Sequence, residues 1–436
     1  MGYRDIYKES NEQAEERFSL VMERIAEIAE ETDVPETFDD YFKKTAAFLL
    51  QLKSVLEKAE ADTLKDASLT ECEKQNAGFY DDIKAENYGK SYGNPTYAVE
   101  KLGEEYGQIL SALYAECRKR ITDVYAAKKM NVTITAELFV EIYNYFEDKE
   151  GIDKTAIEQA VYWYFHDYSE IFIGDSVREL VDSEEDFLYQ IVMNSDLNDL
   201  RYLYQYGQHI GKNETGIAAF LNGMSDEEIQ AMADTYTEGY RIGFAATGKD
   251  LSKKTTAQVR YPIGFERMVC AAVKNLEKLN LKVTMRACSS AANKQYDYDH
   301  KEDKALYYDK AYVERRLEVM KTSFEEMKKL ANGQAGPAVI EVFGEIPFSP
   351  ETKKEVLKLD EKQQQLSVYD MSMSGQITNQ YIIGEERSFT IIAYPVPEIG
   401  EKFEEIFAET VKINTLDYTL YQNMQQKIID VLDQAE

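Results

Sequence analysis

The sequence is poor in residue types on which several common kinds of protein depend. Among 436 residues there are four cysteines and three histidines, and no apolar run approaches the roughly 20 residues needed to cross a bilayer. The cysteines are far apart, without a C-x-x-C pair, and no H-E-x-x-H motif occurs. Neither a disulfide framework nor a zinc site of these kinds is therefore predicted.

Positive charge is also scarce. Lys and Arg total 50 and Asp and Glu total 80, so the formal net charge is −30. This balance argues against a sequence-independent grip on DNA or RNA and against docking onto an anionic membrane surface. The first residues contain no apolar segment typical of a secretory signal. Together with four scattered thiols, this predicts a cytoplasmic location.

Apolar residues make up 44% of the chain and aromatic residues 12%, which is enough to build hydrophobic cores. The composition changes near residue 250. Residues 1–250 hold 51 acids and 25 bases, whereas residues 251–436 hold 29 acids and 25 bases and six of the eight prolines. We therefore expect a domain boundary at 245–255, with an acidic domain over 1–250 and a second domain over 251–436.

The first part has the periodicity of amphipathic helices. Apolar residues recur at helical spacing in three stretches: Phe18, Val21, Met22, Ile25 and Ile28; Phe42, Thr45, Phe48, Leu49, Leu52 and Leu56; and Val99, Leu102, Tyr106, Ile109, Leu110 and Leu113. Thr135 is expected to begin a helix, and so is Ser225, which has Glu228 three residues on. An acidic helical bundle or array is predicted.

The second part alternates strands and helices. We expect strands at 256–261, 281–286, 338–343 and 389–394 and helices at 265–279, 308–331, 352–366 and 402–413. The first strand, helix and strand have the length of a βαβ unit. The last two strands are nearly continuous apolar runs, which predicts cover on both faces of the sheet. The fold class is thus an all-α N-terminal half followed by an α/β domain with a mostly parallel sheet.

The tyrosines at positions 202, 204 and 206 are interpreted as packing surface, with a tyrosine-lined ligand groove as the alternative. The last helix has an apolar stripe and no glycine cap, and acids lie at its negative end. Its residues are the N-cap Asp417, the stripe Leu420, Tyr421, Met424, Ile428, Val431 and Leu432, and the acids Asp430, Asp433 and Glu436. This pattern is typical of an element that lies within a longer chain.

No local motif predicts a catalytic, cofactor-binding or metal-binding residue. The stretch 243–250 satisfies G-x-x-x-x-G-K but then offers Asp250 where magnesium binding needs Ser or Thr. No glycine-rich fingerprint follows the 256–261 strand, and the acidic run 297–303 lacks the turn glycine of a calcium loop. His166 and Glu170 share a helical face, but a carboxylate near a histidine is uninformative among 80 acids.

Four longer segments resemble the aminopeptidase T-like metallo-aminopeptidases, in particular long members with an added helical N-terminal region. They are YFHDYSEIFIGDSVRELVD from Tyr164, TAQVRYPIGFERMVCAAVKNL from Thr256, GPAVIEVFGEIPFSP from Gly336 and GEERSFTIIAYPVPEIGEKFEEIFAETVKINTLDY from Gly384. The resemblance implies a two-domain, usually dimeric exopeptidase that releases N-terminal residues from peptides. It also implies two divalent ions, zinc or cobalt, held by Glu, His, Tyr and Asp and activating a water molecule.

In that family the metal ligands lie in the second domain, whereas the matched segments resemble the first domain and the added helical region. No metal ligand is carried over to a residue of this sequence, so the chain alone is expected to bind no metal and to be inactive. The first hypothesis is therefore the non-metal-binding portion of such a peptidase. The alternative is a non-catalytic module that binds a protein or peptide through the acidic helical half. An enzyme with an unrecognised site is a third hypothesis.

Overall fold

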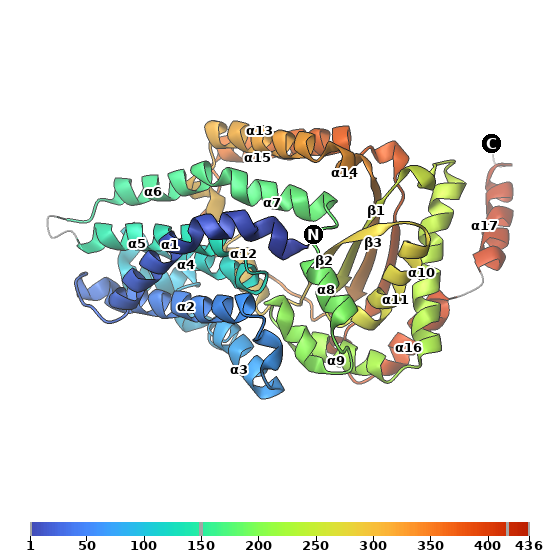
Figure 1. Cartoon of the computed structure of the whole chain (residues 1–436), viewed down its shortest axis with the longest axis horizontal. Coiled ribbons are helices and arrows are strands. Elements are labelled where there is room, and N and C mark those ends of the chain that lie inside the picture. The colour runs from blue at the N-terminus through green and yellow to red at the C-terminus, as the bar shows by residue number, and fades with distance from the viewer. Residues whose placement is uncertain (1, 148–150, 416–417, 435–436) are drawn as a thin grey trace.

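The computed structural model describes residues 2–147, 151–415 and 418–434 and contains a helical lobe and a lobe built on a β-sheet (Figure 1). The predicted fold class is confirmed. We call α1 to α7 the helical lobe: α1 (Tyr3–Ile28), α2 (Glu36–Glu60), α3 (Leu69–Tyr80), α4 (Pro95–Tyr125), α5 (Lys129–Glu147), α6 (Lys154–Asp167) and α7 (Ser169–Val181).

The remaining elements form the second lobe, called here the sheet lobe. Its strands are β1 (Thr256–Pro262), β2 (Lys282–Cys288), β3 (Gln334–Phe343) and β4 (Thr390–Pro395). Its helices are α8 (Phe187–Asn194), α9 (Lys212–Asn222), α10 (Asp226–Ala246), α11 (Glu266–Lys278), α12 (Lys294–Asp299), α13 (Lys310–Glu326), α14 (Lys328–Asn332), α15 (Glu361–Tyr381), α16 (Phe403–Asn414) and α17 (Tyr418–Leu432). The short 3₁₀ helix η3 (Leu200–Tyr206) also belongs to it.

The core of the helical lobe is built on the predicted apolar stripes. Every residue of the stripes predicted in α1 and α2 is buried, and α1 packs against α5 while α2 packs against α4. Aromatic rings dominate the centre of this core. The ring of Phe42 lies 5.0 Å from that of Tyr143 and 5.1 Å from that of Phe146, both in edge-to-face contact. Such pairs add specific geometry to the burial of apolar area.

One of the two predicted helix starts is confirmed and the other is wrong. At Ser225 the hydroxyl accepts the backbone N–H of Glu228 at 3.2 Å, and the Glu228 carboxylate accepts the Ser225 N–H at 2.9 Å. This reciprocal cap begins α10. Thr135 instead lies inside α5, where its hydroxyl donates to the Asn131 carbonyl at 3.0 Å. A hydroxyl that back-bonds within a helix carries the same local signal as a cap.

The helix predicted at 352–366 is also largely wrong. The chain from 344 to 360 has no regular structure, and α15 begins only after Asp360, whose carboxylate accepts the Gln363 N–H at 2.7 Å. The irregular segment instead makes contacts with the helical lobe. Lys353 lies at its centre and reaches across to Asn94 at 2.8 Å. These long-range contacts replace the local hydrogen bonds that a helix would supply.

The sheet is parallel throughout, with strand order β2-β1-β3-β4. Helices α10, α11 and α16 cover one of its faces (Figure 1). Buried side chains of α10, including Tyr240 and Phe244, belong to the same core as Val259 and Tyr394 of the strands. The core of the helical lobe instead runs from Ala14 to Tyr164. The predicted domain boundary at 245–255 stays a prediction.

The opposite face of the sheet is only half covered, contrary to the prediction from the apolar runs. The end of α7 covers Thr284 and Gln334, which both hydrogen-bond to the Leu180 carbonyl. Beyond it, Phe343 is 40% exposed and Ile391 58% exposed. We call this region the open sheet face and define it by Arg260, Arg286, Val339, Glu341, Phe343, Phe389 and Ile391. An apolar run therefore marked a strand without guaranteeing a covering layer.

Buried polar contacts join the two lobes. The Asp299 carboxylate accepts a hydrogen bond from the Tyr88 hydroxyl of the helical lobe at 2.7 Å. It accepts another from the Lys353 ammonium of the irregular segment at 2.5 Å. Asp299 is 1% exposed, so its charge is compensated by these donors rather than by water. A second tie comes from Asn76 of α3, which donates to the Gln208 carbonyl at 2.8 Å and accepts the Ile210 N–H at 3.2 Å. The two lobes are thus joined by hydrogen bonds at two separate places.

The last helix, α17, exposes an apolar stripe. Met424, Ile428 and Val431 are 56%, 61% and 68% exposed. Figure 1 places α17 beyond α10, on the side of that helix away from the sheet. None of the described helices, α17 included, is long and apolar enough to span a bilayer. The predicted N-cap Asp417 lies outside the described residues.

Gly336 at the start of β3 provides a test of the fold. Its φ of +107° is unfavourable for any residue with a side chain, and an added Cβ would overlap the Ser388 carbonyl oxygen. We expect Gly336→Ala to lower the free energy of unfolding by about 2–4 kcal/mol, measured by urea denaturation. Gly375→Ala is the matched control, because this exposed glycine of α15 has no neighbour within 4 Å. It should be neutral or stabilising by up to about 1 kcal/mol; equal effects of both substitutions would contradict this description.

Candidate functional site

The crevice at the carboxyl ends of the strands is filled by the chain itself. Parallel sheets bind ligands where neighbouring strands lead in opposite directions, which in this order is between β1 and β3. The first turn of α9 occupies this position. Its Glu214 carboxylate accepts the Ser290 N–H at 2.6 Å, and Asn213 accepts the Glu398 N–H at 3.2 Å. Both side chains are buried, so the usual ligand position of this architecture is used for packing.

The turn after β1 is likewise closed to anions. The backbone N–H of Gly264 donates to the Glu266 carboxylate at 2.8 Å, and the Tyr202 hydroxyl donates to the same oxygen at 2.8 Å. In nucleotide-binding sheets the N–H groups of this turn bind phosphate. Here a carboxylate of the chain takes that place and would repel a phosphate. The absence of a glycine-rich fingerprint in the sequence thus has a structural counterpart.

Glu266 is the most strongly perturbed acid of this region. Complete burial raises its pKa to about 7, against the lowering effect of the hydrogen bonds from Tyr202 and Gly264. The hydroxyl groups of Tyr206 and Tyr261 lie nearby and pair with each other at 3.0 Å. Among the described residues, the second carboxylate oxygen of Glu266 has no hydrogen-bond partner. The side chain therefore titrates near neutral pH.

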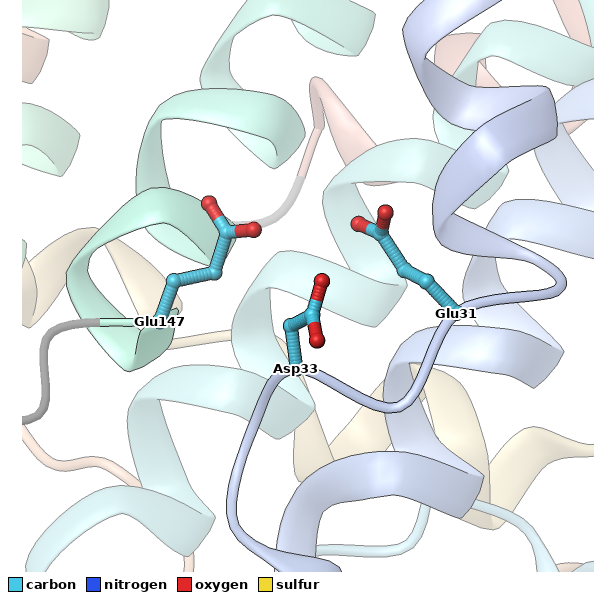
Figure 2. A group of neighbouring side chains, drawn as sticks. All are labelled: Glu31, Asp33 and Glu147. Carbon is cyan, nitrogen blue, oxygen red and sulfur yellow. The ribbon is translucent and has the colours of Figure 1, made fainter.

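A carboxylate trio that the sequence analysis did not single out lies at the ends of α1 and α5. Oxygen atoms of Glu31, Asp33 and Glu147 lie within 4.8 Å of one another, and Figure 2 shows the three carboxylates converging. However, the Arg24 guanidinium lies 2.8 Å from Glu31 and 2.9 Å from Glu147. Burial of Glu31 opposes its ionisation, but hydrogen bonds from Arg24 outweigh that effect and lower its pKa.

Arg24 pairs with two of these three acids, Glu31 and Glu147, and so partly compensates their charge. The trio offers only hard oxygen ligands and no histidine, so it does not match the ligand set for two zinc or cobalt ions that the resemblance implies. The trio is an arginine-centred ion-pair cluster. In the described part of the chain, no other group of three potential ligands comes this close together.

The three histidines lie in separate surroundings. His166 on α6 stacks near Tyr162 at 5.4 Å, and His209 approaches the Ser290 carbonyl at 3.2 Å. His300 lies between the Asp303 carboxylate at 2.7 Å and the Gly93 carbonyl at 2.6 Å. Each ring thus has its own polar or aromatic neighbours. The prediction that none of them is a functional metal ligand stays a prediction.

A groove of about 1090 Å³ lies at the junction of the two cores. We call it the junction groove. The helical lobe forms one wall through α2, α3 and the loop between them, and α8 with η3 forms the other. Its polar and aromatic lining includes Tyr3, Gln51, Cys72, Gln75, Gly78, Tyr125, Phe187, Gln190, Asn194, Tyr202, Tyr204 and Gln205. Tyr202, Tyr204 and Tyr206 are all buried in the core of the sheet lobe, which confirms their interpretation as packing surface. Tyr202 and Tyr204, but not Tyr206, also border the groove.

Amide side chains distinguish this lining. Gln75 donates to the Tyr125 hydroxyl at 2.6 Å, and Gln190 to Asp186 at 2.5 Å. Gln51 and Gln205 make no side-chain hydrogen bond with any described residue and are only half-buried. Gly78 makes room for the first of these, because an added Cβ there would lie 2.5 Å from the Gln51 amide nitrogen. Donors and acceptors are therefore available on both walls.

Substituting Glu266 tests the electrostatic description of the sheet lobe. In unfolded protein the pKa of a glutamate is about 4.3, so raising the pH from 5.5 to 8 disfavours the folded wild type, in which that pKa is about 7. Glu266→Gln removes this titration. We expect the free energy of unfolding of wild type to fall by about 2 kcal/mol relative to the variant over this pH range, measured by urea denaturation.

The matched control is Glu57→Gln, which changes an exposed carboxylate of α2 in the same way. Its difference from wild type should stay constant over the same range. A constant difference for Glu266→Gln as well would contradict the raised pKa of Glu266 and its complete burial.

Comparison with known proteins does not assign the chain to a family. No protein-family model, curated protein or solved structure matches the chain significantly. The resemblance to aminopeptidase T-like enzymes accordingly stays a prediction from four sequence segments, and the junction groove is the feature on which a functional proposal can be built.

Proposed function

We propose that the chain binds peptides in the junction groove and serves as the non-metal-binding portion of an aminopeptidase T-like metallopeptidase. The observation that carries the proposal is the amide-rich lining. A peptide unit offers one N–H and one C=O, and a glutamine side chain offers both complementary groups. Gln51 and Gln205 supply such groups from opposite walls. The resemblance supports the same ligand class, because these peptidases act on peptides.

Aromatic and apolar side chains complete the match to a peptide. Tyr204 and Phe187 present ring surface, and Val55 with Ile191 present aliphatic surface, beside the amides in the same groove. Charges in the lining are partly paired already: Arg201 binds Asp199 at 2.7 Å and Lys65 binds Asp62. The groove therefore presents amides and rings together with further charged side chains, namely Lys58, Asp66, Glu71, Lys74 and Asp196. These charges offer partners to the termini or charged side chains of a peptide.

The alternative, a peptide- or protein-binding module without a link to a peptidase, uses the same groove, since one of its walls comes from the acidic helical half. Under the first hypothesis the complete enzyme carries two divalent ions, zinc or cobalt, and cleaves the peptide. A cytoplasmic location is part of the proposal; the four cysteines, all unpaired, agree with a reducing compartment.

Blocking the groove tests peptide binding. Ser54 is exposed on α2 and lines the groove, so Ser54→Trp places an indole ring in it. We expect wild type to bind members of an arrayed library of fluorescein-labelled hexapeptides. The variant should bind the same peptides at least about tenfold more weakly, which corresponds to about 1.4 kcal/mol, in fluorescence anisotropy titrations.

Ala47→Trp is the matched control, because Ala47 is exposed on the same face of α2, two turns away and outside the groove lining. It should leave peptide affinity unchanged. Equal losses from both substitutions, or no binding by wild type, would contradict the proposed site. Turnover of leucine p-nitroanilide by the purified chain with zinc or cobalt would contradict its non-catalytic assignment.

A further inference from the structure

Two apolar surfaces of the chain lack cover, and their charges match. The open sheet face carries Arg260 and Arg286 side by side on neighbouring strands, and Glu341 lies two residues beyond the first row on β3. On α17, Lys427 precedes the acids Asp430 and Asp433 by one to two turns. We propose that α17 docks on the open sheet face of a second copy of this chain, in a reciprocal exchange. This proposal does not rest on peptide binding.

The charge spacing along the two surfaces agrees. Two residues of a strand span about 6.6 Å, which separates the arginine row from Glu341. Lys427 and the acids at positions 430 and 433 are separated by about 4.5–9 Å along the helix axis. The negative end of α17 would thus meet the two arginines, while Lys427 meets Glu341. The helix dipole adds partial negative charge at that end.

The apolar parts of the two surfaces are also suited to each other. Ile428 and Val431 project from α17 with more than half of their surface exposed, and Phe389 and Ile391 do the same on the sheet. An amphipathic helix laid across a sheet is the usual cover of a parallel β-layer. The exposed rings and branched side chains would be removed from water on both partners at once.

The occupant of the open sheet face is a second copy because the chain's own α17 lies elsewhere. Helix α16 ends at Asn414, whose side chain donates to the Ala393 carbonyl of the edge strand β4 at 3.3 Å, and α17 begins four residues later at Tyr418. In Figure 1 α17 lies beyond α10, away from the sheet, and leaves the open sheet face of its own chain uncovered. An exchange between two copies covers both surfaces.

The area involved favours exchange over simple pairing of two helices. Docking two α17 helices on two sheet faces would bury on the order of 2000 Å², which is in the range of stable protein interfaces. Pairing the two 15-residue helices with each other would bury about half of that. A reciprocal exchange is also closed by a two-fold axis and leaves neither surface uncovered.

Analytical ultracentrifugation of the full chain and of two single variants tests the exchange. The chain has a mass of 50.2 kDa, and we expect wild type to sediment with twice this mass. Ile428→Asp on α17 and Ile391→Asp on the open sheet face should each shift the protein to a monomer. Mixing the two variants should restore a weaker dimer, since one intact helix then meets one intact face. The control is Leu20→Asp, which introduces the same charge at an exposed apolar residue of α1, and this variant should remain dimeric.

A charge exchange sharpens the test. Arg286→Glu should weaken the dimer at least about tenfold, and combining it with Asp430→Lys and Asp433→Lys should recover most of that loss. A monomeric wild type would overturn the proposal. So would a dimer that Ile428→Asp disrupts and Ile391→Asp does not, because that result indicates pairing of α17 with α17. Circular dichroism verifies that each variant is folded.

Discussion

The buried carboxylate of Asp299 ties the two lobes together, and apolar packing of α7 against α13 and α15 joins them at a second place. Within the sheet lobe the carboxylate accepts hydrogen bonds from Lys353 and Gln295, and from the helical lobe it accepts one from Tyr88. Removing one partner of such a buried pair leaves an uncompensated charge, which costs more than the pair itself contributes. The separate tie from Asn76 joins α3 to the chain just after η3, beside the junction groove.

At the carboxyl ends of the parallel strands, side chains of the chain itself occupy the usual ligand positions. The switch-point crevice is occupied by Glu214 and Asn213 of α9, and the anion position after β1 by Glu266. These are polar groups that a ligand-binding sheet would offer to its ligand, but here they bind backbone N–H groups of the same chain. Side chains without partners in the described chain lie instead at the junction groove, and exposed apolar side chains lie on the open sheet face.

Local periodicity predicted much of the fold but little of the candidate site. The stripes of α1 and α2 and the strand order of a βαβ unit follow from spacing within about 30 residues. The predictions of a helix start at Thr135 and of a helix over 352–366 were wrong because tertiary contacts determine the structure there. The cover of the sheet depends on elements that are distant in the sequence. The groove lining joins Gln51 to Gln205, and no local pattern relates residues so far apart.

The position of the groove between two hydrophobic cores has a thermodynamic consequence. One wall belongs to the helical lobe and the other to α8 and η3, so a molecule that contacts both Gln51 and Gln205 would bind only while the two lobes remain joined. Such a molecule would stabilise the folded chain against separation of its lobes, by an amount set by its concentration relative to its Kd.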